Sequence, residues 1–158
     1  MKRFKEWWYI LKVCHKYGIR LWPFSSIGRG TYWSYNPWLE GPTIRVNLFD
    51  KHLMEIFLHE VGHHIADRVG YAKKYSKYIE TTPEGGRILV RGRSYMVMLH
   101  EESFASRFAV KVNRNLDREQ LVKWFQTYVH AGYETAYIND KISLTDSVYK
   151  LIRRIENV

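Results

Sequence analysis

The sequence predicts an α+β fold in which several helices are combined with a small antiparallel sheet. Apolar residues recur every three or four positions in stretches near both ends and in the middle of the chain. This spacing is typical of amphipathic helices. Residues 19–48 instead contain short β-branched and aromatic runs that are broken by glycine and proline. Such runs are typical of strands joined by turns.

Composition indicates one domain over residues 1–158. The chain is long enough to bury a core, 46% of its residues are hydrophobic, and no repeat or linker divides it. No apolar run approaches the roughly 18–20 residues that cross a bilayer, so we expect no transmembrane segment. Lys12 interrupts the N-terminal apolar stretch, which therefore does not resemble a signal peptide. Cys14 is the single cysteine, which excludes an internal disulfide and favours a reducing, cytoplasmic compartment.

The charge balance is strongly basic. The formal net charge is +9 and the sequence pI is about 9.6. A basic surface favours acidic partners, such as nucleic acid, a membrane surface or an acidic protein. A solvated basic surface without such a partner is an equally good interpretation. Nucleic-acid binding therefore stays an alternative, and the sequence contains no indication of the oligomeric state.

The first helix is predicted from Lys2 to Tyr17, ending at Gly18. We expect one apolar stripe to pack on the core, formed by Phe4, Trp7, Trp8, Leu11 and Cys14. The alternative is a basic, tryptophan-bearing helix that lies on a membrane surface.

Three strands are predicted next, at residues 19–22, 31–35 and 43–47. In the last of these, Ile44 and Val46 face one way and Arg45 the other. We expect the three strands to form the antiparallel sheet. We further expect the strand Thr43–Asn47 to lie at its edge, where an extended peptide can be added as a further strand.

The central helix is predicted from Asp50 to Val69. Asp50 is a suitable N-cap, and Gly70 is suited to the C-terminal cap. Gly62 lies inside this helix, where glycine costs roughly 1 kcal/mol relative to alanine. We expect it either to permit the close approach of another backbone or to be merely tolerated.

Further helices are predicted at 96–112, 117–130 and 145–155. Asp117 and Gln120 resemble a capping box, and Gly132 is expected to end the helix that they begin. Between the central helix and residue 96 lies a basic segment, Tyr71–Tyr95, which could bind phosphates but is more often a solvated surface.

The central helix carries the pattern H-E-x-x-H at residues 59–63. Residues four apart lie on one helix face, so His59 and His63 can direct two imidazoles at one ion. Glu60 is then placed to take a proton from water bound to that ion. The sequence therefore predicts a Zn²⁺ site that hydrolyses a peptide bond.

A catalytic zinc ion needs a third protein ligand. The extended pattern that ends in a third histidine is absent, because Ala66 and Val69 occupy the positions of its glycine and histidine. Helical geometry leaves three candidates, namely Asp67, Glu101 and Glu102. Asp67 can equally orient His63 without touching the ion. Tyr95, His100 and Tyr133 are guesses for a residue that stabilises the oxyanion.

Residues 40–112 resemble the ImmA/IrrE-type metallopeptidases, a gluzincin-like branch of the zincins. The resemblance is carried by the strand Thr43–Asn47, by His59–His63, and by a following helix with the family's spacing at Glu102, Ala105, Phe108 and Ala109. It implies a zincin-like metallopeptidase domain in which His59, His63 and Glu102 bind zinc and Glu60 is the general base. Ser106 departs from the asparagine or aspartate that is usual in the family.

The resemblance also implies the kind of substrate, an intracellular protein such as a transcriptional repressor. Two other functions compete with this one. The chain could be a zincin-fold binding protein that has no catalytic activity. It could also be a basic nucleic-acid-associated protein in which the H-E-x-x-H pattern holds a structural metal.

Overall fold

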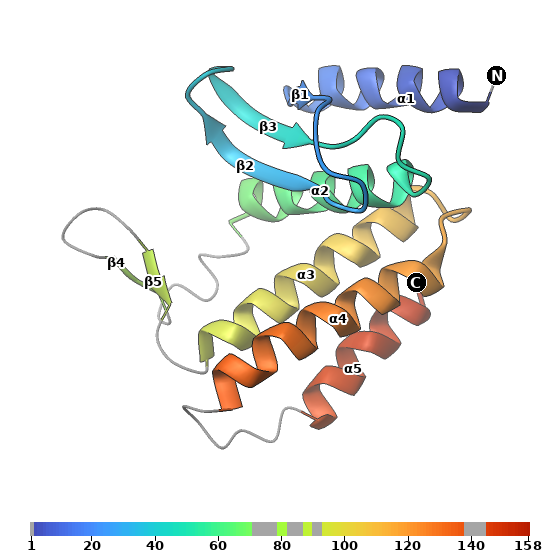
Figure 1. The fold of residues 1–158 in the computed structure, drawn as a ribbon. Coiled ribbons are helices and arrows are strands. Elements are labelled where there is room, and N and C mark those ends of the chain that lie inside the picture. The colour runs from blue at the N-terminus through green and yellow to red at the C-terminus, as the bar shows by residue number, and fades with distance from the viewer. Residues whose placement is uncertain (1, 71–78, 82–86, 90–92, 138–144) are drawn as a thin grey trace.

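The computed structural model describes residues 2–70, 79–81, 87–89, 93–137 and 145–158, and for 79–81, 87–89, 93–97, 130–137 and 145–147 it describes the backbone alone. The described chain is α+β, with five helices and a three-stranded sheet (Figure 1). The helices are α1 (Lys2–Tyr17), α2 (Leu53–Arg68), α3 (Arg93–Val112), α4 (Arg118–Tyr137) and α5 (Thr145–Glu156). The sheet contains β1 (Arg20–Trp22), β2 (Thr31–Asn36) and β3 (Gly41–Arg45), and a separate pair is formed by β4 (Ile79–Thr81) and β5 (Arg87–Leu89).

Helix α1 packs on the core with a different face from the one predicted. It ends before Gly18, which has a φ of 66°, as expected. The fully buried residues of α1 are Ile10, Val13 and Cys14, and the Trp7 indole N–H donates to the Leu48 carbonyl at 3.0 Å. The other members of the predicted stripe are exposed, namely Phe4, Trp8 and Leu11. The prediction that α1 packs on the core is confirmed, with Trp7 and Cys14 among the packed residues, and it was wrong for Phe4, Trp8 and Leu11. Helix α1 carries two adjacent apolar stripes, and periodicity does not indicate which one packs.

The sheet is mixed, and the prediction of an antiparallel sheet was wrong for one strand. Its order is β1-β3-β2, with β3 antiparallel to β2 and parallel to β1. The strand predicted to lie at the edge, β3, is therefore central, and its backbone bonds are used by both neighbours. Strand β2 lies at an edge of the sheet instead, because it pairs with β3 alone in the described part of the chain. Short alternating runs predict strands, but they contain no information on the order of pairing.

Helix α2 begins at Leu53, and Asp50 is not its N-cap. The buried Asp50 carboxylate accepts the N–H of Gly28 and, at 2.8 Å, the N–H of His52. It thereby joins the turn before α2 to the loop that leads into β2. The C-terminal prediction is confirmed, because Gly70 has a φ of 68° and its N–H donates to the Asp67 carbonyl.

Gly62 allows α2 and α3 to approach at backbone distance. A Cβ atom at Gly62 would lie 2.6 Å from Ala105 Cα and 2.8 Å from the Ala105 carbonyl oxygen. Both values are below the contact distance of real Cβ atoms, so only glycine fits. The predicted close approach is confirmed, and it sets the spacing of the two helices that carry the candidate ligands.

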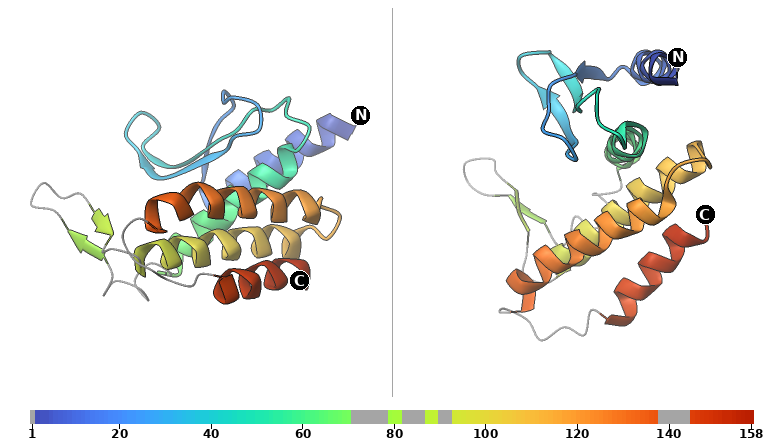
Figure 2. Two further views of the ribbon diagram at one scale, coloured as in Figure 1. Left: turned by 60° about the horizontal axis from the view of Figure 1, so that its bottom comes forward. Right: turned by 45° about the vertical axis from the view of Figure 1, so that its right-hand side comes forward.

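Helices α3, α4 and α5 pack together on the side of α2 that faces away from the sheet (Figures 1 and 2). Leu99 of α3 shares a buried cluster with Phe125 of α4 and Leu151 of α5. Asp117 caps α4 as predicted, since its carboxylate accepts the Gln120 N–H at 2.9 Å. The return bond of a capping box is not formed, because the Asp117 N–H donates to Glu55 Oε1 at 3.0 Å.

Helix α4 does not end at Gly132 but continues to Tyr137. A single interior glycine costs only about 1 kcal/mol, which makes it a weak stop signal. Most of the predicted basic segment Tyr71–Tyr95 lies outside the described residues. Among the described helices, none is both long enough and apolar enough to cross a membrane.

Candidate metal centre

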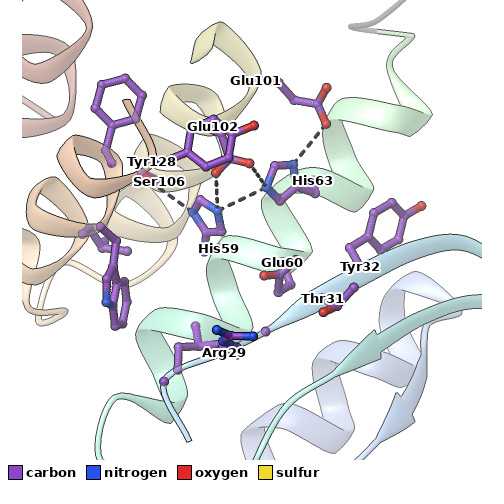
Figure 3. Close-up of a pocket in the computed structure, with 16 residues that line it drawn as sticks. Arg29, Thr31, Tyr32, His59, Glu60, His63, Glu101, Glu102, Ser106 and Tyr128 are labelled. Carbon is purple, nitrogen blue, oxygen red and sulfur yellow. Dashed lines mark hydrogen bonds and ion pairs between the residues drawn. The ribbon is translucent and has the colours of Figure 1, made fainter. Parts of the chain in front are cut away.

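Helices α2 and α3 bring three metal-binding side chains together (Figure 3). The Nε2 atoms of His59 and His63 lie 3.1 Å apart. The two oxygens of Glu102 lie 3.0 Å from His59 Nε2 and 3.3 Å from His63 Nε2. The two histidines are one turn apart on α2, and Glu102 comes from α3, which the glycine contact holds against α2. These three residues could hold a metal ion.

The donor set and its spacing fit Zn²⁺. Zinc takes imidazole nitrogen and carboxylate oxygen at about 2.0–2.2 Å in a tetrahedral arrangement, which places neighbouring donors about 3.3–3.6 Å apart. The three observed separations, 3.0, 3.1 and 3.3 Å, are close to these values. Small outward shifts of the side chains would accommodate the ion. Three protein ligands also leave the fourth position for water or substrate, as catalytic zinc sites do.

Both imidazoles are held by a second contact at Nδ1. His59 Nδ1 lies 3.1 Å from Ser106 Oγ, and His63 Nδ1 lies 3.0 Å from a carboxylate oxygen of Glu101. A ring that binds a metal through Nε2 carries its hydrogen on Nδ1, where it needs such an acceptor. Ser106 supplies this contact to His59, and Glu101 supplies it to His63.

The adjacent glutamates Glu101 and Glu102 have different places. Glu102 faces the Nε2 atoms of both histidines, whereas Glu101 reaches the far side of the His63 ring. Asp67, the third candidate ligand, lies outside the cluster, and its carboxylate accepts the Tyr32 hydroxyl at 3.0 Å. Helical periodicity could not choose among these three acids as the third ligand. The tertiary contacts favour Glu102, because it alone faces both Nε2 atoms.

The site stabilises positive charge. Burial opposes charge on His63, but its hydrogen bonds with Glu101 and Glu102 prevail and raise its pKa to about 10. Burial also opposes ionisation of Glu102, yet its hydrogen bonds with the two histidines hold its pKa well below its usual range. Both directions have one cause, because the carboxylates and the imidazoles lie close enough for each to stabilise the charged form of the other.

Glu60 is buried beside the cluster, on the side toward β2 (Figure 3). Burial raises its pKa, which the charges of the two histidines and a hydrogen bond from the Tyr32 backbone partly offset. Gly30 lies directly against it: a Cβ atom there would be 2.7 Å from Glu60 Oε1 and 2.5 Å from Ile56 Cγ2. The chain entering β2 therefore needs a glycine at this point so that Glu60 keeps its position.

The three candidate ligands, His59, His63 and Glu102, line one cavity of about 560 Å³ together with Glu60. The loop and strand residues from Gly28 to Tyr32 form one wall. The opposite wall comes from α4 and is mainly apolar, formed by Leu121, Trp124, Phe125 and Tyr128. The cavity thus places an open strand edge and an apolar helix face on either side of the cluster.

The sequence did not indicate several of these residues. Gly30 and the wall from α4 were missed, because each reaches the site only through tertiary packing. The Gly-Arg-Gly run at 28–30 was the available signal for the first wall, since glycines ahead of a strand often mark a close approach. Of the guessed oxyanion residues, His100 does not line the cavity, and the side chains of Tyr95 and Tyr133 lie outside those described.

His64 was predicted not to be a ligand, and it lies outside the group of candidate ligands formed by His59, His63 and Glu102. It is buried on another face of α2, and its Nδ1 lies 3.2 Å from the Tyr32 hydroxyl oxygen. Burial lowers its pKa, so the neutral ring is favoured. His64 therefore helps to fix Tyr32 between α2 and β2.

Comparisons of the chain with models of protein families, with curated proteins and with solved structures find no match.

Proposed function

We propose that this protein is a zinc-dependent metallopeptidase with a zincin-like fold, related to the ImmA/IrrE type. One observation carries the proposal. Two histidines on α2 and Glu102 on α3 converge at hydrogen-bonding distances, with each ring anchored at Nδ1 and with the buried Glu60 beside them. A merely structural cluster does not need a buried carboxylate next to an open cavity.

Each residue of the centre has a distinct task. His59, His63 and Glu102 would hold Zn²⁺, and Ser106 and Glu101 would orient the two rings. When bound, zinc supplies Lewis-acid chemistry, polarising a carbonyl group and making water more acidic.

Glu60 acts as the general base. Because burial raises its pKa, the carboxylate can accept a proton from the attacking water and hold it. It then gives this proton to the nitrogen of the leaving amine. General acid–base help of this kind contributes about 10²–10⁴-fold to the rate.

The substrate backbone binds along β2. This strand pairs with β3 on one side only in the described chain, and its first residues, Thr31 and Tyr32, line the cavity. An extended peptide can add to such an edge through main-chain hydrogen bonds. It would then run between β2 and the apolar wall from α4. We further propose that the substrate is a specific cytoplasmic protein, such as a transcriptional repressor, on the strength of the family resemblance.

The first test is metal analysis of protein purified without added zinc, followed by titration with zinc. We expect about one equivalent of bound zinc. Substituting Glu102→Gln should lower the affinity strongly, and Glu119→Gln, an exposed glutamate of α4, should not. Protein that neither contains nor takes up zinc would overturn the proposal.

The second test separates catalysis from binding. Zinc-loaded wild type and Glu60→Gln are incubated with peptides from a cell digest, and new N-termini are identified by mass spectrometry. We expect Glu60→Gln to keep zinc and to lose cleavage by at least about 100-fold. Equal cleavage by both proteins would remove Glu60 from its role. Zinc binding without any cleavage would favour a zincin-fold binding protein. Capture of cellular proteins on Glu60→Gln then identifies the substrate.

Nucleic-acid binding is a second candidate function, because the described chain has a basic groove that shares no lining residue with the cavity of the candidate metal centre. Helices α3 and α5 line it with Arg107, Lys111, Arg153 and Arg154 beside two phenylalanines. Cations can bind phosphates while aromatic rings stack on bases. Binding of single-stranded DNA at low salt that weakens steeply as salt is added would support this function. No binding at low salt would reject it.

A further inference from the structure

Helix α1 presents a large apolar surface to solvent. Phe4, Trp8 and Leu11 are 70%, 56% and 51% exposed. They are spaced i, i+4 and i+7, so they form one continuous stripe along the helix, which we call the outer stripe. Single exposed apolar residues are common on protein surfaces, but a contiguous row of large ones marks an interaction site.

The outer stripe takes no part in the fold or in the metal centre. Helix α1 already packs on the core through Ile10, Val13 and Cys14. No residue of the outer stripe lines the cavity of the metal centre. Helix α1 lies at one end of the molecule, with α2 between it and the α3–α5 group (Figure 1). The core therefore does not explain why these three side chains are apolar.

Positive charge adjoins the outer stripe. At 100° per residue, three lysines of α1 follow the same flank of the outer stripe, namely Lys5, Lys12 and Lys16, whereas Lys2 falls toward the opposite face. The Lys12 ammonium lies 5.6 Å from the centre of the Trp8 ring, so charge and apolar surface are in direct contact. Glu6 is the one acidic residue of α1, and Arg3 neutralises it at 3.0 Å.

We propose that α1 binds the surface of a lipid bilayer that contains anionic lipids. Helices that lie in a membrane interface combine tryptophan, phenylalanine and leucine on one face with lysines beside it. The outer stripe would enter the boundary between headgroups and acyl chains, while the lysines contact the anionic headgroups. Helix α1 spans 16 residues and carries five basic residues in addition to His15, so it lies on the bilayer and does not cross it. The positive charge favours this occupant over an uncharged protein surface or a second copy of the same basic helix.

Sedimentation with lipid vesicles tests the proposal on the full chain. We expect wild type to bind vesicles of phosphatidylcholine with about one third phosphatidylglycerol, and to bind pure phosphatidylcholine weakly. The variant Phe4→Ser/Trp8→Ser/Leu11→Ser should bind the anionic vesicles at least about tenfold more weakly. The variant Lys5→Gln/Lys12→Gln should lose about fivefold per lysine at low salt.

Trp38→Ser is the matched control, because Trp38 is 84% exposed but lies in the turn between β2 and β3. It should bind vesicles as wild type does. Circular dichroism checks that each variant is folded, and zinc content should stay at the wild-type level. Absence of wild-type binding at low salt, or an equal loss in the control, would overturn the proposal. So would a wild-type dimer that the triple serine variant converts to a monomer, since a second copy would then cover the outer stripe.

Discussion

Ser106 contacts the His59 ring through the nitrogen that does not face the other candidate ligands. Its hydroxyl lies 3.1 Å from His59 Nδ1, the atom that must be held when Nε2 binds a metal. Substituting Ser106→Ala removes this partner and leaves the ring free to rotate. We expect zinc affinity to fall about 10–100-fold, measured by competition with a chelator of known affinity.

Ser103→Ala is the control for this prediction. Ser103 lies on the same helix and is also buried, but its hydroxyl donates to the Leu151 carbonyl, away from the centre. This variant should lower the stability of the fold and leave zinc affinity unchanged. If both variants bind zinc as wild type does, the hydroxyl of Ser106 has no orienting role.

Cys14, on the buried face of α1, lies in the core, and burial raises the pKa of its thiol to about 11. A raised pKa keeps the thiol protonated through neutral pH, and only the thiolate reacts. We expect alkylation of the native protein at pH 8 to be at least about 100-fold slower than in urea, and to speed up as the pH approaches 11. Mass spectrometry after timed quenching measures both rates. Rapid labelling of the native protein would show that α1 opens readily.

At the scale of elements, the contact between α2 and α3 determines the geometry of the centre. Gly62→Ala would place a Cβ atom 2.6 Å from Ala105 Cα, which is part of a backbone and cannot move alone. The helices must separate, and we expect the free energy of unfolding to fall by about 1–3 kcal/mol, despite the better helix propensity of alanine. Urea denaturation measures this change, and zinc affinity should fall with it.

Gly41→Ala is the comparison, because a Cβ atom at Gly41 would meet nothing within 4 Å. Its free energy of unfolding should stay within about 0.5 kcal/mol of the wild-type value. A Gly62→Ala protein as stable as this control would mean that α2 and α3 can move apart without cost.

At the scale of the whole molecule, the proposed metal would tie α2 to the group formed by α3, α4 and α5. The donors come from α2 and α3, so the folded state binds zinc and the unfolded chain does not present the same site. Zinc at 100 times its dissociation constant adds about 2.7 kcal/mol. For a chain of this size we expect chelation to lower the melting temperature by about 5–10 °C.

Differential scanning fluorimetry with zinc and with a chelator measures this shift. His63→Ala should abolish it, whereas Lys123→Gln, an exposed change on α4, should retain it. A melting temperature that does not respond to zinc in the wild type would show that the cluster is not a metal site linked to folding.

Local patterns predicted most of the elements but not their arrangement. Helices α1, α2, α3 and α5 and strands β1, β2 and β3 were expected within a few residues, because periodicity and glycine caps act over one or two turns of chain. The packed face of α1, the central place of β3 and the continuation of α4 past Gly132 were not. In each case the alternative packing, pairing or helix end has a similar free energy locally. Contacts with residues distant in the sequence decide between the alternatives.

The same division applies to the candidate site. His59, Glu60 and His63 could be identified from the sequence, because a helix fixes the relative direction of residues four apart. The choice of Glu102 over Glu101 came from family resemblance alone, since neighbouring residues on α3 both flank its apolar face. Packing at Gly62 turns α3 so that Glu102 faces the histidines and Glu101 lies behind one of them. Spacing along one helix is a local property, whereas the alignment of two helices is set by how their surfaces fit.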